Sequence, residues 1–196
     1  MLVKVGWLII SYLLGAIPFG LLYSLYIKGE DVRTSGSGNI GATNIIRNYG
    51  WPPGVLTLFL DMLKGGIPVY VACWFVPSIT GFHILAGGFA ILGHIYPVYL
   101  KFSGGKGVAT STGVFAVLTP KPLLLALVVF VAGVGATRYM SVGSLLGAII
   151  LPVITGYFSG YTHPYTMGTV GVVLLVLWRH RENISRLYHG EENTFF

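Results

Sequence analysis

The sequence predicts an all-α, polytopic membrane protein that forms a single domain over residues 1–196. Only 9% of its 196 residues are charged and 54% are hydrophobic, whereas a soluble domain carries about 25% charged residues. Long stretches carry no charge at all, among them Val5 to Ile27 and Tyr139 to Trp178. About 20 apolar residues span a bilayer as a helix, and lipid favours helices because their backbone hydrogen bonds close within the segment. The runs are continuous rather than alternating, which disfavours a membrane β-barrel.

Seven apolar segments are predicted to form transmembrane helices, and clusters of proline, glycine and serine separate most of them. Segments 107–118 and 165–178 are short for a full crossing. We expect the last one to continue as a helix through Arg179 to Leu187. The seven segments are 3–27, 54–76, 80–100, 107–118, 122–137, 141–158 and 165–178.

Basic residues test this count, because the cytoplasmic loops of membrane proteins are enriched in lysine and arginine. With seven spans the chain ends on opposite sides, and nine of the 12 basic residues fall on one side. That side is predicted to be cytoplasmic, which places the N-terminus outside and the C-terminus in the cytoplasm. The net charge of +6 then suits anionic lipid or an anionic substrate rather than nucleic acid. The nine residues are Lys28, Arg33, Arg47, Lys101, Lys106, Arg138, Arg179, Arg181 and Arg186.

The first polar cluster on the predicted cytoplasmic side is the segment 33–47, which contains a G-x-G-x-x-G match at Gly36, Gly38 and Gly41. A dinucleotide site would need a preceding strand, whereas a predicted membrane helix precedes these glycines. Two interpretations stay open, a flexible surface loop and a glycine nest that binds an anion through backbone N–H groups. Further donors in the segment are Ser35, Ser37, Asn39, Thr43, Asn44 and Arg47.

The second cluster, 101–112, places Lys106 between glycines at the start of a predicted helix. It lacks the P-loop pattern, because Leu100 stands where a P-loop has its first glycine. A lysine at a helix N-terminus still offers charge and N–H groups to an anion. The third cluster, 179–191, puts Arg179, His180, Asn183, Arg186 and Leu187 on one helix face. For both clusters the alternative is a basic anchor to lipid headgroups.

Other polar groups suggest structure rather than chemistry. Asp61 and Lys64 lie three residues apart in a predicted span and are expected to form an ion pair. The single cysteine, Cys73, cannot form an internal disulfide. The chain has no G-x-S-x-G elbow, no H-x-x-x-x-D and no metal-ligand spacing. We therefore expect no metal or cofactor, and a site that acts by binding, positioning and charge stabilisation.

Three segments together resemble the motifs of the PlsY family: "SGSGNIGATN", "GHIYPVYLKFSGGKGVAT" and "RHRENISRLYHGEE"; "RYMSVGS", from Arg138, is similar more weakly. The resemblance implies a bacterial cytoplasmic (inner) membrane enzyme with a cytoplasmic active site. It implies transfer of a fatty acyl group from acyl phosphate to the 1-hydroxyl of glycerol 3-phosphate. The products would be 1-acylglycerol 3-phosphate (lysophosphatidate) and phosphate, in the first acylation of phospholipid synthesis. Neither acyl-CoA nor acyl carrier protein would be the donor.

With this resemblance, we expect Lys106 and the 35–44 loop to hold phosphates, Arg47 and His180 to orient glycerol phosphate or balance charge, and Asn183 to donate to the developing oxyanion. Ser35 is expected to be a polar contact, and a substrate phosphate to take the hydroxyl proton. The expected partners are the two substrates, the bilayer and, transiently, the enzyme that produces acyl phosphate, with no nucleic acid. The alternative is a transporter of a small phosphorylated solute, although no inverted repeat is visible. Further expected binding residues are Gly36, Ser37, Gly38, Asn39, Gly41, Thr43, Asn44, Gly104, Gly105, Gly107, Ser141, Arg179 and Arg186.

Overall fold

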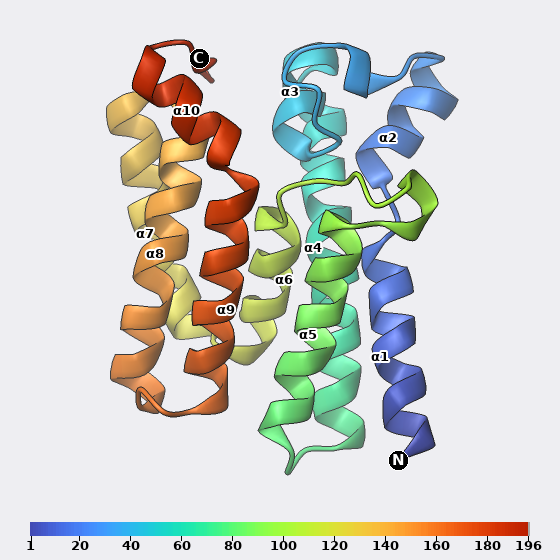
Figure 1. Cartoon of the computed structure of the whole chain (residues 1–196), viewed down its shortest axis with the longest axis vertical. Helices are drawn as coiled ribbons and strands as arrows, with labels where there is room; N and C mark the ends of the chain where they lie inside the picture. The colour runs from blue at the N-terminus through green and yellow to red at the C-terminus, as the bar shows by residue number, and fades with distance from the viewer. Residues whose placement is uncertain (196) are drawn as a thin grey trace. The chain divides into compact units, whose positions relative to one another are not determined.

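The computed structural model describes residues 1–195, and this part of the chain is helical with no β-strand, as predicted. Figure 1 shows the helices in chain order from blue to red. The elements are α1 (Leu2–Gly15), α2 (Phe19–Tyr23), the π-helix η1 (Ser24–Lys28), the 3-10 helix η2 (Val32–Thr34), α3 (Ala42–Tyr49), α4 (Trp51–Phe75), α5 (Thr80–Ile95), the 3-10 helix η3 (Val98–Leu100), α6 (Val108–Leu118), α7 (Pro120–Thr137), α8 (Met140–Ser159), α9 (Pro164–Arg179) and α10 (Arg181–His189).

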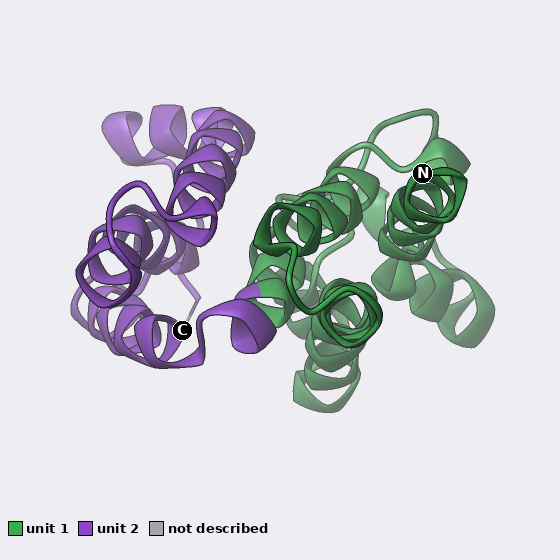
Figure 2. Cartoon of the chain, turned by 90° about the horizontal axis from the view of Figure 1, so that it is seen from below, with its two compact units in different colours: residues 1–114 green, residues 115–196 purple. Residues whose placement is uncertain are grey.

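The chain divides into two compact units, Met1–Val114 and Phe115–Phe196, and the boundary falls inside α6 (Figure 2). In unit 1, α1 packs against α4 and α5, and α3 packs against α4. The approach of α1 to α5 is close, because a Cβ at Gly15 would collide with the backbone of Ala90. Small residues allow such contact between apolar helices. In unit 2, α8 packs against both α7 and α9.

Each of the seven predicted segments contains a helix, and four are long and apolar enough to cross a membrane: α4, Thr80–Leu100, α7 and α8. A fifth crossing is present if α1 and the segment Phe19–Lys28 count as one bent span. The helices α6 and α9 are apolar but have only 11 and 16 residues. The protein therefore has the helices of an integral membrane protein, and the count of seven crossings stays a prediction.

The structure differs from the sequence expectation at three places. The first predicted span bends by 43° between α1 and Phe19–Lys28, where Pro18 lacks the N–H that a continuous helix needs. The helix α3 begins at Ala42, inside the polar segment 33–47 that was expected to be a loop, and continues past it to Tyr49. The expected continuation of the last span through Leu187 is wrong, because His180 leaves helical geometry (φ −98°, ψ 6°) and separates α9 from α10.

Candidate active site

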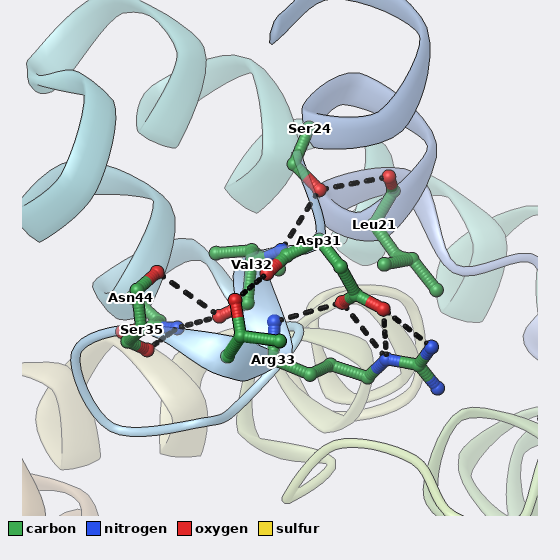
Figure 3. A network of polar contacts seen from close by, with 8 residues as sticks. Leu21, Ser24, Asp31, Val32, Arg33, Ser35 and Asn44 are labelled. Carbon is green, nitrogen blue, oxygen red and sulfur yellow. Dashed lines mark hydrogen bonds and ion pairs between the residues drawn. The ribbon is translucent and has the colours of Figure 1, made fainter. Parts of the chain in front are cut away.

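The Ser35–Asn44 loop joins η2 to α3 in unit 1, and the side chain of Asn44 holds it in shape (Figure 3). The amide nitrogen of Asn44 donates to the carbonyls of Val32, Ser35 and Asn39 at 3.0, 3.2 and 2.8 Å. Its amide oxygen accepts from the N–H of Ser37 at 2.8 Å. Only 1% of Asn44 is exposed. Asn44, expected as a phosphate contact, therefore uses its polar atoms to fix the loop.

Gly36 and Gly38 have left-handed backbones, with φ of 60° and 67°, a region that glycine adopts without steric cost. This geometry is typical of the predicted nest. The loop nevertheless uses several of its own donors: Gly38 donates to the carbonyl of Ser35 at 3.0 Å and Gly41 to the side chain of Asn39 at 2.9 Å. Side chains such as those of Ser35 and Thr43, both half-buried, are then the better candidates for contact with a ligand.

An exposed ion pair borders this loop. The guanidinium of Arg33 donates to both carboxylate oxygens of Asp31, with a shortest distance of 2.6 Å, as Figure 3 shows. Hydrogen bonds from Arg33 hold the pKa of the Asp31 carboxyl below its usual value. Arg33 is thereby neutralised by its neighbour and adds little positive charge to the loop.

A hydrophobic cluster lies beneath the loop and connects it to the second polar segment. Leu21, Val32, Ile40 and Ile45 are buried together, and Leu100 packs against them. Leu100 ends η3, which precedes the glycine–lysine segment. Two of the three predicted clusters therefore share one small core within unit 1.

The Gly104–Gly107 loop is held by the backbone of the helix that precedes it. Gly104 donates to the carbonyl of Ile95 at 3.1 Å, and Gly105 donates to the carbonyl of His94 at 3.0 Å. Gly105 is buried against the imidazole of His94, with which an added Cβ would collide. Gly107 has φ +85° and leads into α6, so Lys106, which is half-buried, precedes the helix N-terminus. The sequence predicted this placement of the lysine.

The predicted ion pair of Asp61 and Lys64 is confirmed. The Nζ atom of Lys64 lies 2.7 Å from Oδ1 of Asp61, and the side chains are only 3% and 2% exposed. Nδ1 of His94 lies 3.8 Å from the same oxygen. Nothing in the sequence indicates that this pair is connected to the Gly104–Gly107 loop. His94 connects them, since its imidazole lies near Asp61 and packs against Gly105.

The third cluster lies in unit 2, at α10 and the end of α9. His180 and Asn183 are buried, at 2% and 4% exposure, while Arg181 and Glu182 are exposed. The burial matches the predicted polar face despite the break at His180. Nδ1 of His180 lies 2.8 Å from the carbonyl of Val176. In the neutral ring Nδ1 then carries the proton, and Nε2 holds the lone pair.

Glu192 is the residue of this cluster that sequence reasoning missed. It accepts from the amide of Asn183 at 2.6 Å and from Nε of Arg186 at 2.8 Å. The hydroxyl of Ser141 is buried without a well-formed hydrogen bond, but it lies close enough to the same carboxylate to lower its pKa. Burial acts to raise the pKa of Glu192, but these donors outweigh it and leave the pKa below its ordinary value. Its sequence signal was its place as the last residue of the third PlsY-like motif, "RHRENISRLYHGEE".

Comparison with known proteins adds to this geometry. The family model described as "Glycerol-3-phosphate acyltransferase" matches residues 5–190. The chain belongs to this family. A glycerol-3-phosphate acyltransferase of Endomicrobium trichonymphae is 44% identical over 193 residues, which cover 98% of this chain and 96% of that protein. One of Desulfotalea psychrophila is 46% identical over 191 residues, with 95% of both chains covered.

Two solved structures of the family share the fold. A crystal structure of PlsY, an integral membrane glycerol 3-phosphate acyltransferase, in its glycerol 3-phosphate form has a TM-score of 0.93 at 38% identity. It covers 99% of this chain and 96% of its own. The lysophosphatidic acid form has a TM-score of 0.90 at 37% identity, with 98% and 95% covered. The resemblance to the PlsY family and the interpretation as an acyltransferase are confirmed; nothing supports the transporter alternative.

Proposed function

We propose that the protein transfers a fatty acyl group from acyl phosphate to the 1-hydroxyl of glycerol 3-phosphate. The hydroxyl oxygen bonds to the acyl carbon, the bond from that carbon to the phosphate oxygen breaks, and the hydroxyl proton leaves on phosphate. The products are lysophosphatidate and inorganic phosphate. Family membership and the crystal structures of PlsY in its glycerol 3-phosphate and lysophosphatidic acid forms support this acceptor and this product.

The observation that carries the proposal is the chemistry of the three clusters. They offer lysine, arginine, hydroxyl and amide groups, all of which suit phosphate, and two carboxylates next to them, Asp31 and Glu192, are already hydrogen-bonded. Asp31 is bound by Arg33, and Glu192 is bound by Asn183 and Arg186. A site of this kind stabilises charge on phosphate and on a developing oxyanion by fixed donors.

In unit 1 we assign phosphate binding to Lys106, Arg47 and the hydroxyl groups of the Ser35–Asn44 loop. Lys106 precedes the N-terminus of α6, where its charge adds to that of the helix dipole. Arg47 lies in the last turn of α3. Gly36 and Gly38 permit the turn of the first loop, and Gly104 and Gly105 permit the close packing of the second. Asn44 acts through the shape of its loop.

In unit 2 we assign His180 to orienting the acceptor through Nε2, and Asn183 to donating to the oxyanion. Asn183 already donates to an anionic oxygen, that of Glu192, at 2.6 Å. Arg186 and Ser141 surround the same carboxylate and hold it in place. Arg179 contributes positive charge at the end of α9.

The hydroxyl proton goes to a substrate phosphate under this proposal. Phosphate has a second pKa of about 6, so its dianion is a competent base near neutral pH. Ser35 is a polar contact, and no acyl-serine forms. The acyl phosphate also carries a good leaving group, which removes the need for a strong protein acid.

We further propose that both units serve one acyltransferase domain in the bacterial inner membrane, since the family match runs through both. The basic-residue pattern supports seven crossings, an external N-terminus and a cytoplasmic site. A cytoplasmic site would receive its acyl donor from the enzyme that makes acyl phosphate, in a transient encounter.

The test is product formation in detergent, where transport cannot be observed. Purified protein is mixed with palmitoyl phosphate and glycerol 3-phosphate, beside a control with palmitoyl-CoA in place of the acyl phosphate. The expected result is phosphate and lysophosphatidate in equal amounts, with no reaction from the thioester. Reaction from palmitoyl-CoA alone, or no product from folded protein, would overturn the proposal.

A further inference from the structure

We propose that His94, oriented by the buried Asp61–Lys64 ion pair, is a positioning residue that fixes the Gly104–Gly107 loop and so sets the place of Lys106. None of the three groups needs to touch a substrate. The inference rests on the proposed role of Lys106 in acyl transfer, and every contact that supports it lies within unit 1.

The ion pair is costly unless it has further partners. Both side chains are at least 97% buried, and charges removed from water lose several kcal/mol of solvation that their mutual attraction offsets only with additional hydrogen bonds. A hydrophobic pair of similar volume would often stabilise the same helix equally well. The contacts of the pair therefore indicate what it does for the structure.

Lys64 connects the pair to the broken first span. Its Nζ donates to the carbonyl of Ile17 at 2.6 Å and lies 5.6 Å from the ring centroid of Phe19. Ile17 precedes Pro18, where the bend leaves carbonyls without the N–H of a following turn. Lys64 satisfies one of these carbonyls, which gives the cation a structural purpose.

Asp61 connects the pair to α5. Its Oδ1 lies 2.7 Å from Lys64 and 3.8 Å from Nδ1 of His94. The α4 helix packs against α5, and Asp61 and His94 are both buried at this contact, at 2% and 4% exposure. The carboxylate therefore lies beside Nδ1 of the imidazole at a distance longer than a hydrogen bond, and it acts on the ring through charge and packing.

The opposite side of the imidazole faces the glycine–lysine loop. A Cβ at Gly105 would collide with Nε2 of His94, so the ring and the glycine backbone are in direct packing contact. The backbone of His94 also accepts the N–H of Gly105 at 3.0 Å. The next residue is Lys106. A rotation of the imidazole would change the position of the lysine backbone directly.

The loop needs this support because its approach is strained. Lys101 and Phe102 both have left-handed backbones, with φ of 50° and 62°, and neither is glycine. Such conformations are energetically unfavourable for residues other than glycine and persist only where surrounding contacts impose them. The contacts at His94 and Ile95 supply that constraint on the far side of the turn.

The experiment compares two histidines of the same helix. His94→Asn withdraws the side chain from Gly105 while leaving an amide near Asp61. His83→Asn is the matched control, because His83 is also buried, with 2% exposed. Its Nε2 lies 2.8 Å from the carbonyl of Val76, at the other end of α5 from the Gly104–Gly107 loop. Lys106→Ala and Asp61→Asn complete the set, with Asp61→Asn also made in the His94→Asn background. If Asp61→Asn does not fold, Asp61→Asn with Lys64→Met replaces it.

We expect His94→Asn to lower kcat/KM for acyl transfer by about 10- to 100-fold relative to His83→Asn, at a similar Tm, because small misplacement of a catalytic group has effects of this size. Asp61→Asn alone should lower kcat/KM by a similar factor. In the His94→Asn background it should lower kcat/KM by less than about threefold, since the effects of residues that act through one another are not additive.

Three results would contradict the proposal. One is His94→Asn with the activity of His83→Asn. Another is an Asp61→Asn substitution that lowers kcat/KM by the same factor in the His94→Asn background as in the unsubstituted protein. The third is Lys106→Ala with near-normal kcat/KM, which removes the premise and identifies the assignment of Lys106, rather than the positioning by His94, as the error.

Discussion

The two glycine-rich loops of unit 1 are alike in composition and different in what holds them. The Ser35–Asn44 loop closes on itself, since the amide of Asn44 binds two of its carbonyls, those of Ser35 and Asn39, and that of Val32 just before it. The Gly104–Gly107 loop closes against another element, the end of α5 at His94 and Ile95. Gly38 serves the first loop through its backbone angle, and Gly105 serves the second through its lack of a side chain. A polar side chain thus shapes the first loop, and the buried end of α5 shapes the second.

The largest expected effect is that of Lys106→Ala, which removes the charge that the second loop presents. We expect kcat/KM to fall by about 1,000-fold or more, the upper range for loss of one stabilising donor, while the protein still folds. Lys101→Ala is the matched control, because it removes an exposed lysine from the same segment. Equal losses in the two variants would mean that the segment supplies only general positive charge.

Gly105→Ala tests the requirement for space. Alanine is compatible with the backbone at Gly105, which lacks a positive φ, but its methyl group would displace His94. We expect a loss in kcat/KM of about 100-fold.

In Gly38→Ala the new Cβ would meet only the carbonyl of Arg33 at 3.4 Å, but φ is +67°. That variant should lose about 1–2 kcal/mol of stability and less activity. Thermal unfolding and steady-state kinetics measure both variants. A greater loss of activity in Gly38→Ala than in Gly105→Ala would contradict the different roles of the two glycines.

Asn44→Ala tests whether the first loop depends on its own side chains. The substitution removes this donor from the carbonyls of Val32, Ser35 and Asn39, of which that of Val32 is buried and that of Ser35 still accepts the N–H of Gly38. A buried polar group that loses its partner costs about 1–3 kcal/mol, so a loss of about 1–3 kcal/mol is expected. Asn48→Ala is the control, because Asn48 bonds only to Asn44 among the described contacts, at 2.9 and 3.2 Å. Chemical unfolding in detergent measures both, and a similar cost for the two would contradict the assigned role.

Glu192→Gln extends the comparison to unit 2, where a carboxylate holds a cluster together. Hydrogen bonds to a charged partner contribute about 1.5–3 kcal/mol, and the variant should lose stability in this range near neutral pH. The folded pKa of Glu192 lies below its ordinary 4.5. Its contribution is therefore present above about pH 4.5 and lost as pH falls through the lower folded pKa. The Tm difference from the unsubstituted protein should shrink on acidification. A Tm difference that grows toward low pH would show that the pKa of Glu192 is not lowered in the folded protein.

The smallest expected effect is that of Asp31→Asn at the rim of the first loop. Asp31 binds Arg33 through two oxygens, but both side chains are substantially exposed, at 28% and 43%. Exposed ion pairs contribute about 0–1 kcal/mol and weaken with salt. We expect a Tm change of a few degrees at most at low ionic strength, and less in high salt. A large, salt-independent loss would show that the rim, and not Asn44, holds the loop.

Composition and apolar runs were sufficient to predict the helices, because lipid leaves the backbone no other local solution. The bend at Pro18 and the break at His180 were not predicted as interruptions. Proline at position 18 was visible, but whether a helix continues past a proline depends on partners such as Lys64, which lie far away in sequence.

The site was predictable where chemistry is local and not where it depends on folding. The placement of Lys106 before a helix follows from neighbouring residues. The contacts of Asp61 with His94, and of Glu192 with Asn183, join separate segments that no spacing rule connects. Asn44 shows the reverse case, since a polar residue in a polar motif resembles a ligand contact until its hydrogen bonds are known.

Under the proposed function the acyl group passes directly from acyl phosphate to the 1-hydroxyl of glycerol 3-phosphate, without a protein nucleophile. The most direct test is intact-protein mass spectrometry of the enzyme quenched during turnover of palmitoyl phosphate and glycerol 3-phosphate. We predict unmodified protein while lysophosphatidate and phosphate accumulate in equal amounts. A palmitoyl adduct on Ser35 or Ser37 that forms and decays at the rate of turnover would contradict the claim.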